Sequence, residues 1–430
     1  MKKLKNISFA LLTLAAQVVS ANTDSTDTAL APAQDVRDSI QITSVNDTLK
    51  HMPFQYSFIH PMGTNGVNAG QTVNNLSLNV LIGYQGGVDG VEVAGFSNTL
   101  KYDMRGAQLA GFSNTVLGNV EGGQFAGFVN TSKGYTDGMQ LAGFANLSGD
   151  SLRGLQGAGF VNVANGKSEA IQLAGFANYS RGALQGVQGA GFVNMVSDTV
   201  AGVQAAGFAN INSKGMSGTQ AAGFANITKG DVDGLQISGF LNVAKRVKGV
   251  QIGIINIADT IENGVAIGVL NFVKNGYFGI ELSANESLYA NASLKMGTRM
   301  FYNIFTVGFT PLKNDFILGF GYGVGTETKL NDKWHTNTEL IAYHINETNS
   351  SKGDVFSDDT NLLSKLNVNF GYTLKGNKEI FFGPSLNVLV TQNEKNGKIE
   401  SSLPPYAFYD FLGDYTSVYM WAGINAGFRF

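Results

Sequence analysis

The sequence predicts an all-β fold, and three observations support that prediction. Glycine is abundant, at 55 of 430 residues, whereas proline is rare, at 7. A unit of the form G-x-Q-x-A-G-F-x-N recurs with a spacing of 16 residues through the middle of the chain. Within these units, and again towards the C-terminus, apolar and polar residues alternate with a period of two, which is the period of a β-strand.

The first segment, residues 1–21, has the organisation of a secretory signal peptide. Residues 2–5 are mostly Lys, residues 7–19 form an apolar run, and small residues precede a cleavage position after Ala21. The apolar run is shorter than the about 20 residues that a permanent membrane helix requires. We therefore expect the mature chain to be exported and to begin at Asn22.

The next two segments lead into the repeats. Residues 22–53 are rich in Thr, Asp, Ser and Ala, with little periodicity, and are expected to form a flexible lead-in. Residues 54–91 contain Gly and aromatic residues together with alternating apolar ones, and they are expected to form the first strands.

Composition excludes several classes of protein. There is no Cys, which removes a disulfide framework, a thiol nucleophile and a Cys-ligated metal site. Charged residues make up 14%, against about 25% in typical globular domains. The net charge of −3 gives no reason to expect nucleic acid as a partner.

The repeat region is assigned to residues 92–275. Gln opens each unit from Gln108 to Gln236, with Glu92 in its place in the first. Two drifted copies follow at Gln251–Asn256 and Ala266–Asn271. The unit Phe recurs at Phe96, Phe112, Phe128, Phe144, Phe160, Phe176, Phe192, Phe208, Phe224 and Phe240, with an Asn two residues after each. Each repeat is expected to supply one strand of about nine residues and a turn.

Two architectures fit such strands. In a β-solenoid, identical residues stack on one another about 4.8 Å apart. In an antiparallel meander, Gln would face Asn and Ala would face Phe across neighbouring strands. Large and small residues exchange places in alternate repeats, at Leu141/Ala145, Gly157/Val161, Leu173/Ala177 and Gly189/Val193. Antiparallel pairing would sort them into rows of equal size, and strands of this length can cross a bilayer, so we favour the meander.

Residues 276–430 are expected to form barrel strands. Apolar residues alternate with Lys, Asn and Gly over 365–375, with Gly over 316–325, and with polar residues over 419–430. Apolar-out and polar-in alternation with aromatic residues near the strand ends is typical of membrane barrels. The polar, acidic stretches Asn346–Asn361 and Asn393–Tyr415 resemble extracellular loops.

The resulting prediction is an outer-membrane antiparallel β-barrel-type sheet that incorporates the 16-residue repeats. The alternative is a β-solenoid repeat domain followed by a smaller C-terminal barrel. A water-soluble sandwich could show the same alternation and remains a third reading.

Two resemblances support the membrane reading. Gly427-Phe428-Arg429-Phe430 resembles the last strand of bacterial outer-membrane barrels, which implies recognition by the barrel-assembly machinery. The repeats, with residues 249–256 nearest the general form, resemble the G-x-Q-I-G-x-x-N repeats of surface proteins of diderm bacteria, which implies surface exposure. The units here differ in placing Phe where that family has an aliphatic residue.

A search for reactive groups predicts no catalytic, cofactor-binding or metal-ligating residue. His51, His60, His335 and His344 have no metal-site spacing, and the last two would face opposite sides of one strand. The Gly run at 319–325 lies in an alternating strand with no following helix, so we interpret it as close packing. Asp358-Asp359 is interpreted as a solvated pair, since a Ca²⁺ site needs more oxygen ligands.

The expected function is therefore a structural or surface-binding role at the outer membrane or cell surface, not catalysis. The expected partners are membrane lipid, the assembly machinery and an unidentified surface ligand. A passive channel for small polar solutes is the alternative, because a barrel of about 20 strands would enclose water. A barrel enzyme is a third, weaker reading.

Overall fold

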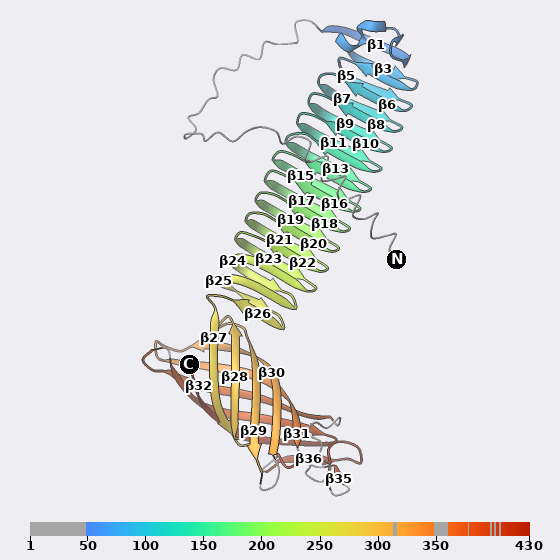
Figure 1. Ribbon diagram of the computed structural model, residues 1–430. Coiled ribbons are helices and arrows are strands. Elements are labelled where there is room, and N and C mark those ends of the chain that lie inside the picture. The colour runs from blue at the N-terminus through green and yellow to red at the C-terminus, as the bar shows by residue number, and fades with distance from the viewer. Residues whose placement is uncertain are drawn as a thin grey trace. The chain divides into compact units, whose positions relative to one another are not determined.

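The computed structural model describes residues 49–312, 316–347, 360–376, 378–395, 398–399, 401–403 and 406–430. The predicted signal peptide and the lead-in up to residue 48 lie outside the described residues, as does Asp358-Asp359. From Leu49 onward, the described chain forms one unit that contains a solenoid and a barrel (Figure 1). Among the described residues, no helix is long and apolar enough to cross a membrane.

The solenoid contains 26 strands in about 13 turns and a short 3-10 helix at Gly66–Gln71. The strands are β1 (Lys50–Ile59), β2 (Met62–Gly63), β3 (Thr72–Asn79), β4 (Ile82–Gln85), β5 (Gly87–Ala94), β6 (Ser97–Leu100), β7 (Met104–Ala110), β8 (Ser113–Val116), β9 (Val120–Ala126), β10 (Val129–Ser132), β11 (Thr136–Ala142), β12 (Ala145–Ser148), β13 (Leu152–Ala158), β14 (Val161–Ala164), β15 (Ser168–Ala174), β16 (Ala177–Ser180), β17 (Leu184–Ala190), β18 (Val193–Val196), β19 (Val200–Ala206), β20 (Ala209–Asn212), β21 (Met216–Ala222), β22 (Ala225–Thr228), β23 (Val232–Ser238), β24 (Leu241–Ile252), β25 (Ile255–Ile267) and β26 (Leu270–Val273).

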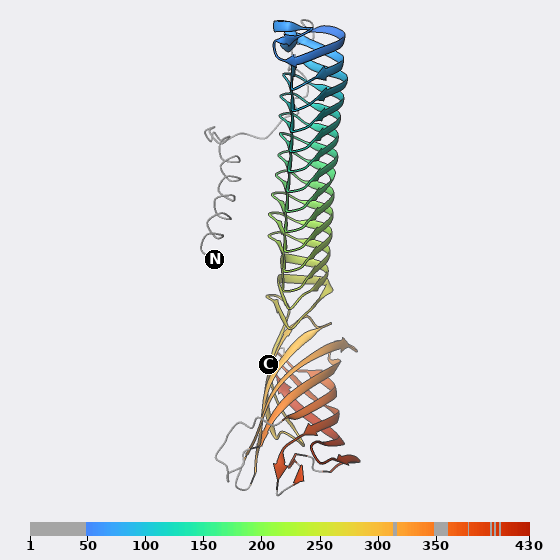
Figure 2. The ribbon, with the colours of Figure 1, turned by 90° about the vertical axis from the view of Figure 1, so that its right-hand side faces the viewer.

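Each repeat is one coil with two strands rather than one. A strand of seven residues such as β13 runs to a Gly-Phe corner, and a strand of four residues such as β14 follows. Within the repeats, each strand pairs in parallel with its counterpart one repeat later (Figure 2). Gln156 therefore aligns with Gln172, and Asn162 with Asn178. The all-β class is confirmed in its alternative form, a solenoid followed by a smaller barrel. The favoured antiparallel meander is wrong for the repeats.

The alternation of large and small residues has a different cause from the one proposed. In the parallel stack, Leu141 and Gly157 are direct neighbours, and a Cβ added at Gly157 would lie 2.8 Å from Leu141 Cδ2. A Cβ at Gly189 would likewise lie 3.0 Å from Leu173 Cδ2. Each Leu therefore leans over the glycine of the next coil. Mixed sizes in one row are a way of filling space, and they do not argue against parallel stacking.

Glycine is abundant because the coils approach closely at two rows. At the corner, a Cβ on Gly159 would lie 2.1 Å from the carbonyl oxygen of Gly143. In the long strand, Gly154 has a φ of +114°, and a Cβ there would lie 2.0 Å from the carbonyl oxygen of Gly138. Any other residue would push the coils apart or adopt an unfavourable backbone conformation.

The predicted boundary between the lead-in and the first strands is a few residues late. Strand β1 begins at Lys50, inside the predicted lead-in, because its residues pair with β3 and cover the first coil. The first strands at 54–91 are present, and the drifted copies continue the stack as parts of β24, β25 and β26.

Among the described residues, the barrel wall contains eight long strands, and three short strands lie in the connection between the last two. The eight are β27 (Tyr277–Asn285), β28 (Ala290–Gly297), β29 (Tyr302–Pro311), β30 (Phe316–Lys329), β31 (Trp334–Glu347), β32 (Asn361–Thr373), β33 (Glu379–Thr391) and β37 (Ser417–Arg429). The short strands β34 (Glu394–Lys395), β35 (Lys398–Ile399) and β36 (Tyr409–Leu412) lie between β33 and β37. Neighbouring long strands are antiparallel, and the pairing of β27 with β37 closes the barrel.

The barrel buries polar residues and exposes apolar ones. In β32, Lys365, Asn367 and Asn369 point inward and are at most 3% exposed, while Leu366 and Phe370 point outward and are 38–40% exposed. The predicted two-faced pattern is therefore confirmed within β32, with the polar face inside, whereas Lys375 lies beyond the strand and is exposed.

Candidate functional sites

Two ladders of buried amides run through the solenoid. In the first, the Nε2 atom of each Gln donates to the Oε1 atom of the Gln one coil earlier, as Gln156 does to Gln140 at 2.7 Å. The nine Gln-to-Gln bonds measure 2.7–3.0 Å. Every donor therefore points towards the N-terminal end of the stack.

The second ladder runs in the opposite sense. The Nδ2 atom of each Asn donates to the Oδ1 atom of the Asn one coil later, as Asn162 does to Asn178 at 2.9 Å. The second Nδ2 hydrogen of Asn162 is donated to the carbonyl oxygen of Leu173 at 2.8 Å. The predicted ladder role of Gln and Asn is confirmed, although like residues pair where Gln was expected to face Asn.

Glu92 ends the Gln ladder on the N-terminal side. Its carboxylate accepts from Gln108 Nε2 at 2.8 Å and from Asn79 Nδ2 at 3.0 Å. A carboxylate suits this position, because the first member of the ladder only needs to accept. Burial away from water nevertheless raises the pKa of Glu92 to about 7, and the hydrogen bonds from Gln108 and Asn79 oppose that rise.

At the other end, the two ladders differ. Ala266 stands where the next Gln would be, so Gln251 Oε1 is buried without a hydrogen-bond partner among the described residues. The Asn ladder continues beyond the last coil, since Asn271 Nδ2 donates to Asn303 Oδ1 of β29 at 2.8 Å. Asn303 Nδ2 in turn donates to Tyr322 Oη at 2.8 Å.

The unit Phe residues form a ridge along one edge of the solenoid. Successive rings are stacked, with centroids 4.7–5.0 Å apart and planes within 12° of parallel. Eight of the ten side chains remain 36–46% exposed, so the predicted packing role is only partly met. Because each inner ring presents its faces to its neighbours, the ridge offers ring edges and no free stacking platform to a sugar or a base.

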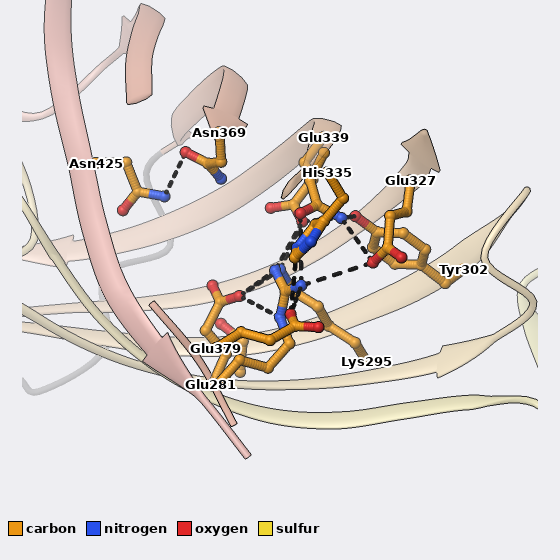
Figure 3. A network of polar contacts seen from close by, with 12 residues as sticks. Glu281, Lys295, Tyr302, Glu327, His335, Glu339, Asn369, Glu379 and Asn425 are labelled. Atoms are coloured by element: carbon orange, nitrogen blue, oxygen red, sulfur yellow. Dashed lines mark hydrogen bonds and ion pairs between the residues drawn. The ribbon is translucent and has the colours of Figure 1, made fainter. Parts of the chain in front are cut away.

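The barrel interior holds a network of charges (Figure 3). Lys295 Nζ lies 2.5 Å from both Glu281 Oε2 and Glu339 Oε1, and Tyr302 Oη donates to Glu339 at 2.7 Å. Arg429 Nη2 donates to Glu281 Oε2 at 2.9 Å, which closes the network across the β27–β37 seam. These side chains are at most 4% exposed, so each charge depends on its partners rather than on water.

One group in this interior has the residue types of a metal site. Ligand atoms of Glu327, His335 and Glu379 lie within 4.8 Å of one another. However, Arg429 Nη1 lies 2.8 Å from Glu379 Oε2 and 3.8 Å from Glu327 Oε2. The guanidinium already supplies the positive charge that a metal ion would bring. His335 Nε2 is 3.3 Å from Glu379 Oε2, with a geometry that falls outside that of a hydrogen bond.

The other residues considered in the sequence are not brought together. His335 is buried in the barrel and His344 is exposed, as their spacing predicted. His51 and His60 lie on the solenoid, where the His60 ring is 4.9 Å from the ring of Tyr84. The glycines at 319–325 line the barrel wall, where a Cβ at Gly325 would meet the Tyr302 ring.

Sequence reasoning missed the charged cluster. Its signal was available in β31, where His335, Asn337 and Glu339 alternate with Thr336 and Thr338 and therefore share one face. Their partners could not be identified, because Lys295 and Arg429 reach them only after the barrel closes. Comparisons with protein-family models, curated proteins and solved structures found no match for this chain.

Proposed function

We propose that this chain is an outer-membrane protein in which the barrel is the membrane anchor and the solenoid is a structural or binding element. The observation that supports it most is the polarity of the barrel. Phe278, Ile280 and Leu282 face outward and are 49–65% exposed, while Glu281 between them is buried. In water such an apolar exterior is unfavourable, whereas in lipid it matches its surroundings. A water-soluble sandwich would place the two faces the other way round.

A channel role is less well supported. The channel alternative depends on a lumen of about 20 strands, whereas eight strands leave an interior that side chains can fill. Trp421, Tyr302 and Lys295 occupy the interior and are completely buried. We therefore favour a structural or binding role over passage of solutes, and we assign no catalytic step to the chain.

Strand connectivity supports a particular orientation. The solenoid enters the barrel at Tyr277, which pairs with Gly297, and the connections at that end are the short ones at 298–301, 330–333 and 374–378. The two longest connections join strand ends at the opposite end of the barrel, one between Glu347 and Asn361 and the other between Thr391 and Ser417. Outer-membrane barrels have short periplasmic turns and longer extracellular loops. We infer that the long loops are exposed at the cell surface and that the solenoid lies on the periplasmic side.

Export agrees with this orientation. A chain with a cleaved signal peptide reaches the periplasm first, and the filled barrel offers no path for more than two hundred residues of solenoid to pass outward. The repeats resemble those of surface-exposed proteins. From that resemblance we keep the association with the outer membrane, but we place the solenoid on the periplasmic side and not at the cell surface.

Anchoring is tested by substitution on the outer barrel face. We expect Leu340→Arg, at a side chain that is 55% exposed, to lower the amount of heat-modifiable barrel in the outer-membrane fraction, because a charge facing lipid costs about 2–4 kcal/mol near the bilayer centre. Tyr415→Arg is the control, since Tyr415 lies in a loop and is 85% exposed. Equal assembly of both variants, or recovery of a water-soluble protein, would contradict the anchor.

Orientation is tested with single Cys variants, because the chain has no Cys. In intact cells, a membrane-impermeant maleimide should label Tyr415→Cys. It should label Lys133→Cys, at an exposed position in the turn between β10 and β11 of the solenoid, only after the outer membrane is permeabilised. Equal labelling of both variants in intact cells would place the solenoid at the cell surface instead.

A further inference from the structure

We propose that the Phe ridge is a self-association surface, by which two copies of the chain pack side by side along their solenoids. The proposal uses the anchoring proposed above only to set the direction in which the two copies run. Its starting point is the size of the exposed apolar surface. Monomeric proteins rarely leave apolar patches larger than a few hundred Å² uncovered.

The ridge alone approaches the area that a dimer needs. A Phe side chain presents about 200 Å², so eight rings that are about 40% exposed contribute roughly 600 Å². Exposed aliphatic side chains beside the ridge, including Leu109, Leu173 and Ile237, enlarge it further. A stable interface typically buries about 800 Å² on each partner.

The same surface also contains a groove into which the Phe ridge of a second copy can fit. Directly beside the ridge lies a groove with a floor of the Ala and Gly residues that precede each Phe, such as Ala126 and Gly127. The same groove appears further along the stack at Ala206 and Gly207. A two-fold arrangement can place the ridge of each copy in the groove of the other, which is the condition for a closed dimer.

The spacing of the rings limits the choice of partner. Ring centroids repeat every 4.7–5.0 Å over ten coils, a distance of about 45 Å. Only another stack of β-strands has the same repeat and can remain in step over that length, as facing sheets do in a dry zipper. A globular partner would match a few coils at most.

A lipid surface fits less well. Amphipathic helices that lie on anionic membranes carry Lys and Arg beside their apolar face, and a sheet in the same position would need the same charges. Here no Lys or Arg is among the described residues that line the groove. The charged side chains, such as Arg153 between Asp137 and Glu169, form ion pairs among themselves in the long strands, away from the groove.

Cross-linking in membranes tests the dimer and its direction. Because both barrels would be inserted in one membrane with the same orientation, we expect each coil to lie beside its counterpart in the other copy. A short bis-maleimide should therefore link Leu109→Cys to itself and Ile237→Cys to itself. Links formed only when the two variants are mixed would mean that the copies run in opposite directions, which would overturn the proposed arrangement.

Charge substitution tests the surface without touching the Phe stack. In the Cys variants, adding Leu173→Lys should reduce the cross-linked dimer at least tenfold, while Ser213→Lys, at an exposed position in the turn between β20 and β21, should leave it unchanged. Outer-membrane fractionation of each variant shows whether a lost cross-link reflects loss of the interface or loss of membrane anchoring. An unchanged yield with Leu173→Lys, or a monomer that binds vesicles of neutral phosphatidylcholine through the ridge, would overturn self-association.

Discussion

The solenoid and the barrel bury polar side chains in opposite ways. The solenoid interior holds neutral amides such as Gln156 and Asn162, each paired with a copy of itself. The barrel interior holds Lys295 and Arg429, each paired with carboxylates from other strands. The difference lies in which residues the topology brings together.

Parallel stacking with a fixed repeat places every residue beside its equivalent. A charged residue inside such a stack would lie about 4.8 Å from the same charge in the next coil, whereas an amide offers both a donor and an acceptor. Antiparallel pairing places unlike residues side by side, so that opposite charges can neutralise each other. Glu92 is consistent with this rule, because it lies at the end of the ladder and has no second carboxylate beyond it.

The largest effect is expected from breaking the barrel network. Lys295→Met leaves Glu281 and Glu339 without their shared ammonium group, and removing one partner of a buried ion pair typically costs 3–5 kcal/mol. Both Trp residues of the chain lie in the barrel, so Trp fluorescence during urea unfolding in detergent reports this region alone. A loss below about 1 kcal/mol would mean that water or another cation satisfies these carboxylates.

The next effect depends on pH and is confined to the solenoid. Burial raises the pKa of Glu92 to about 7, so between about pH 4.5 and 7 the folded chain binds more protons than the unfolded one. Stability should therefore fall by about 3 kcal/mol as the pH rises through that window, and then level off. Glu92→Gln should abolish this dependence, measured by urea unfolding followed by far-ultraviolet circular dichroism.

Glu121→Gln is the matched control, because it removes a carboxyl that is 46% exposed two coils further along. If the wild type and Glu92→Gln lose the same stability over this pH range, the carboxylate is solvated and the ladder end is open to water.

Parts of both regions could be predicted from sequence, for a physical reason. The repeat fixes which residues are equivalent, so the β-strand class and the ladder residues follow from spacing, whereas the division of each repeat into two strands at the Gly-Phe corner was not predicted. It does not fix strand direction, because a period of two is the same for parallel and antiparallel neighbours. Strand direction is established by the backbone pairing of successive coils, such as Gln156 with Gln172, and that pairing is known only from coordinates.

In the barrel, alternation predicts which residues point inward but not which residues meet. Arg429 and Glu281 are 148 positions apart, and their contact depends on strand number and register at closure. Local sequence carries no information on either. The interior polarity was therefore predictable, whereas the charge network was not.

A pair of asparagines two residues apart provides the third test. Asn210 belongs to the ladder and donates to Asn226 Oδ1 at 2.9 Å and to the carbonyl oxygen of Ala221 at 2.8 Å. Asn212 is equally buried, but its amide has no hydrogen-bond partner among the described residues. Its neighbours in the same row are Val196 and Thr228, so an apolar side chain fits there.

The two changes to Val should therefore have opposite signs. Asn210→Val should destabilise the solenoid by about 2 kcal/mol, because it leaves the amide of Asn194 without its acceptor. Asn212→Val should stabilise the solenoid by about 1 kcal/mol, since it removes a buried polar group that has no hydrogen bond to offset its desolvation. Urea midpoints measured by circular dichroism decide the sign, and destabilisation by both would mean that Asn212 is hydrogen-bonded in solution.

The smallest effect is expected from substitution of Arg153, which is the closest analogue of Lys295 on the solenoid surface. Arg153 also lies between two carboxylates, 3.2 Å from Asp137 and 3.5 Å from Glu169, but its side chain is 67% exposed where Lys295 is fully buried. Water solvates all three groups, so their attraction is screened and holding the long side chain in place offsets most of the gain. Arg153→Ala should leave the urea midpoint of the solenoid unchanged within error, at low and at high salt. A clear loss at low salt that disappears at high salt would show that the ion pairs stabilise the coils, and burial would then not be what separates the two regions.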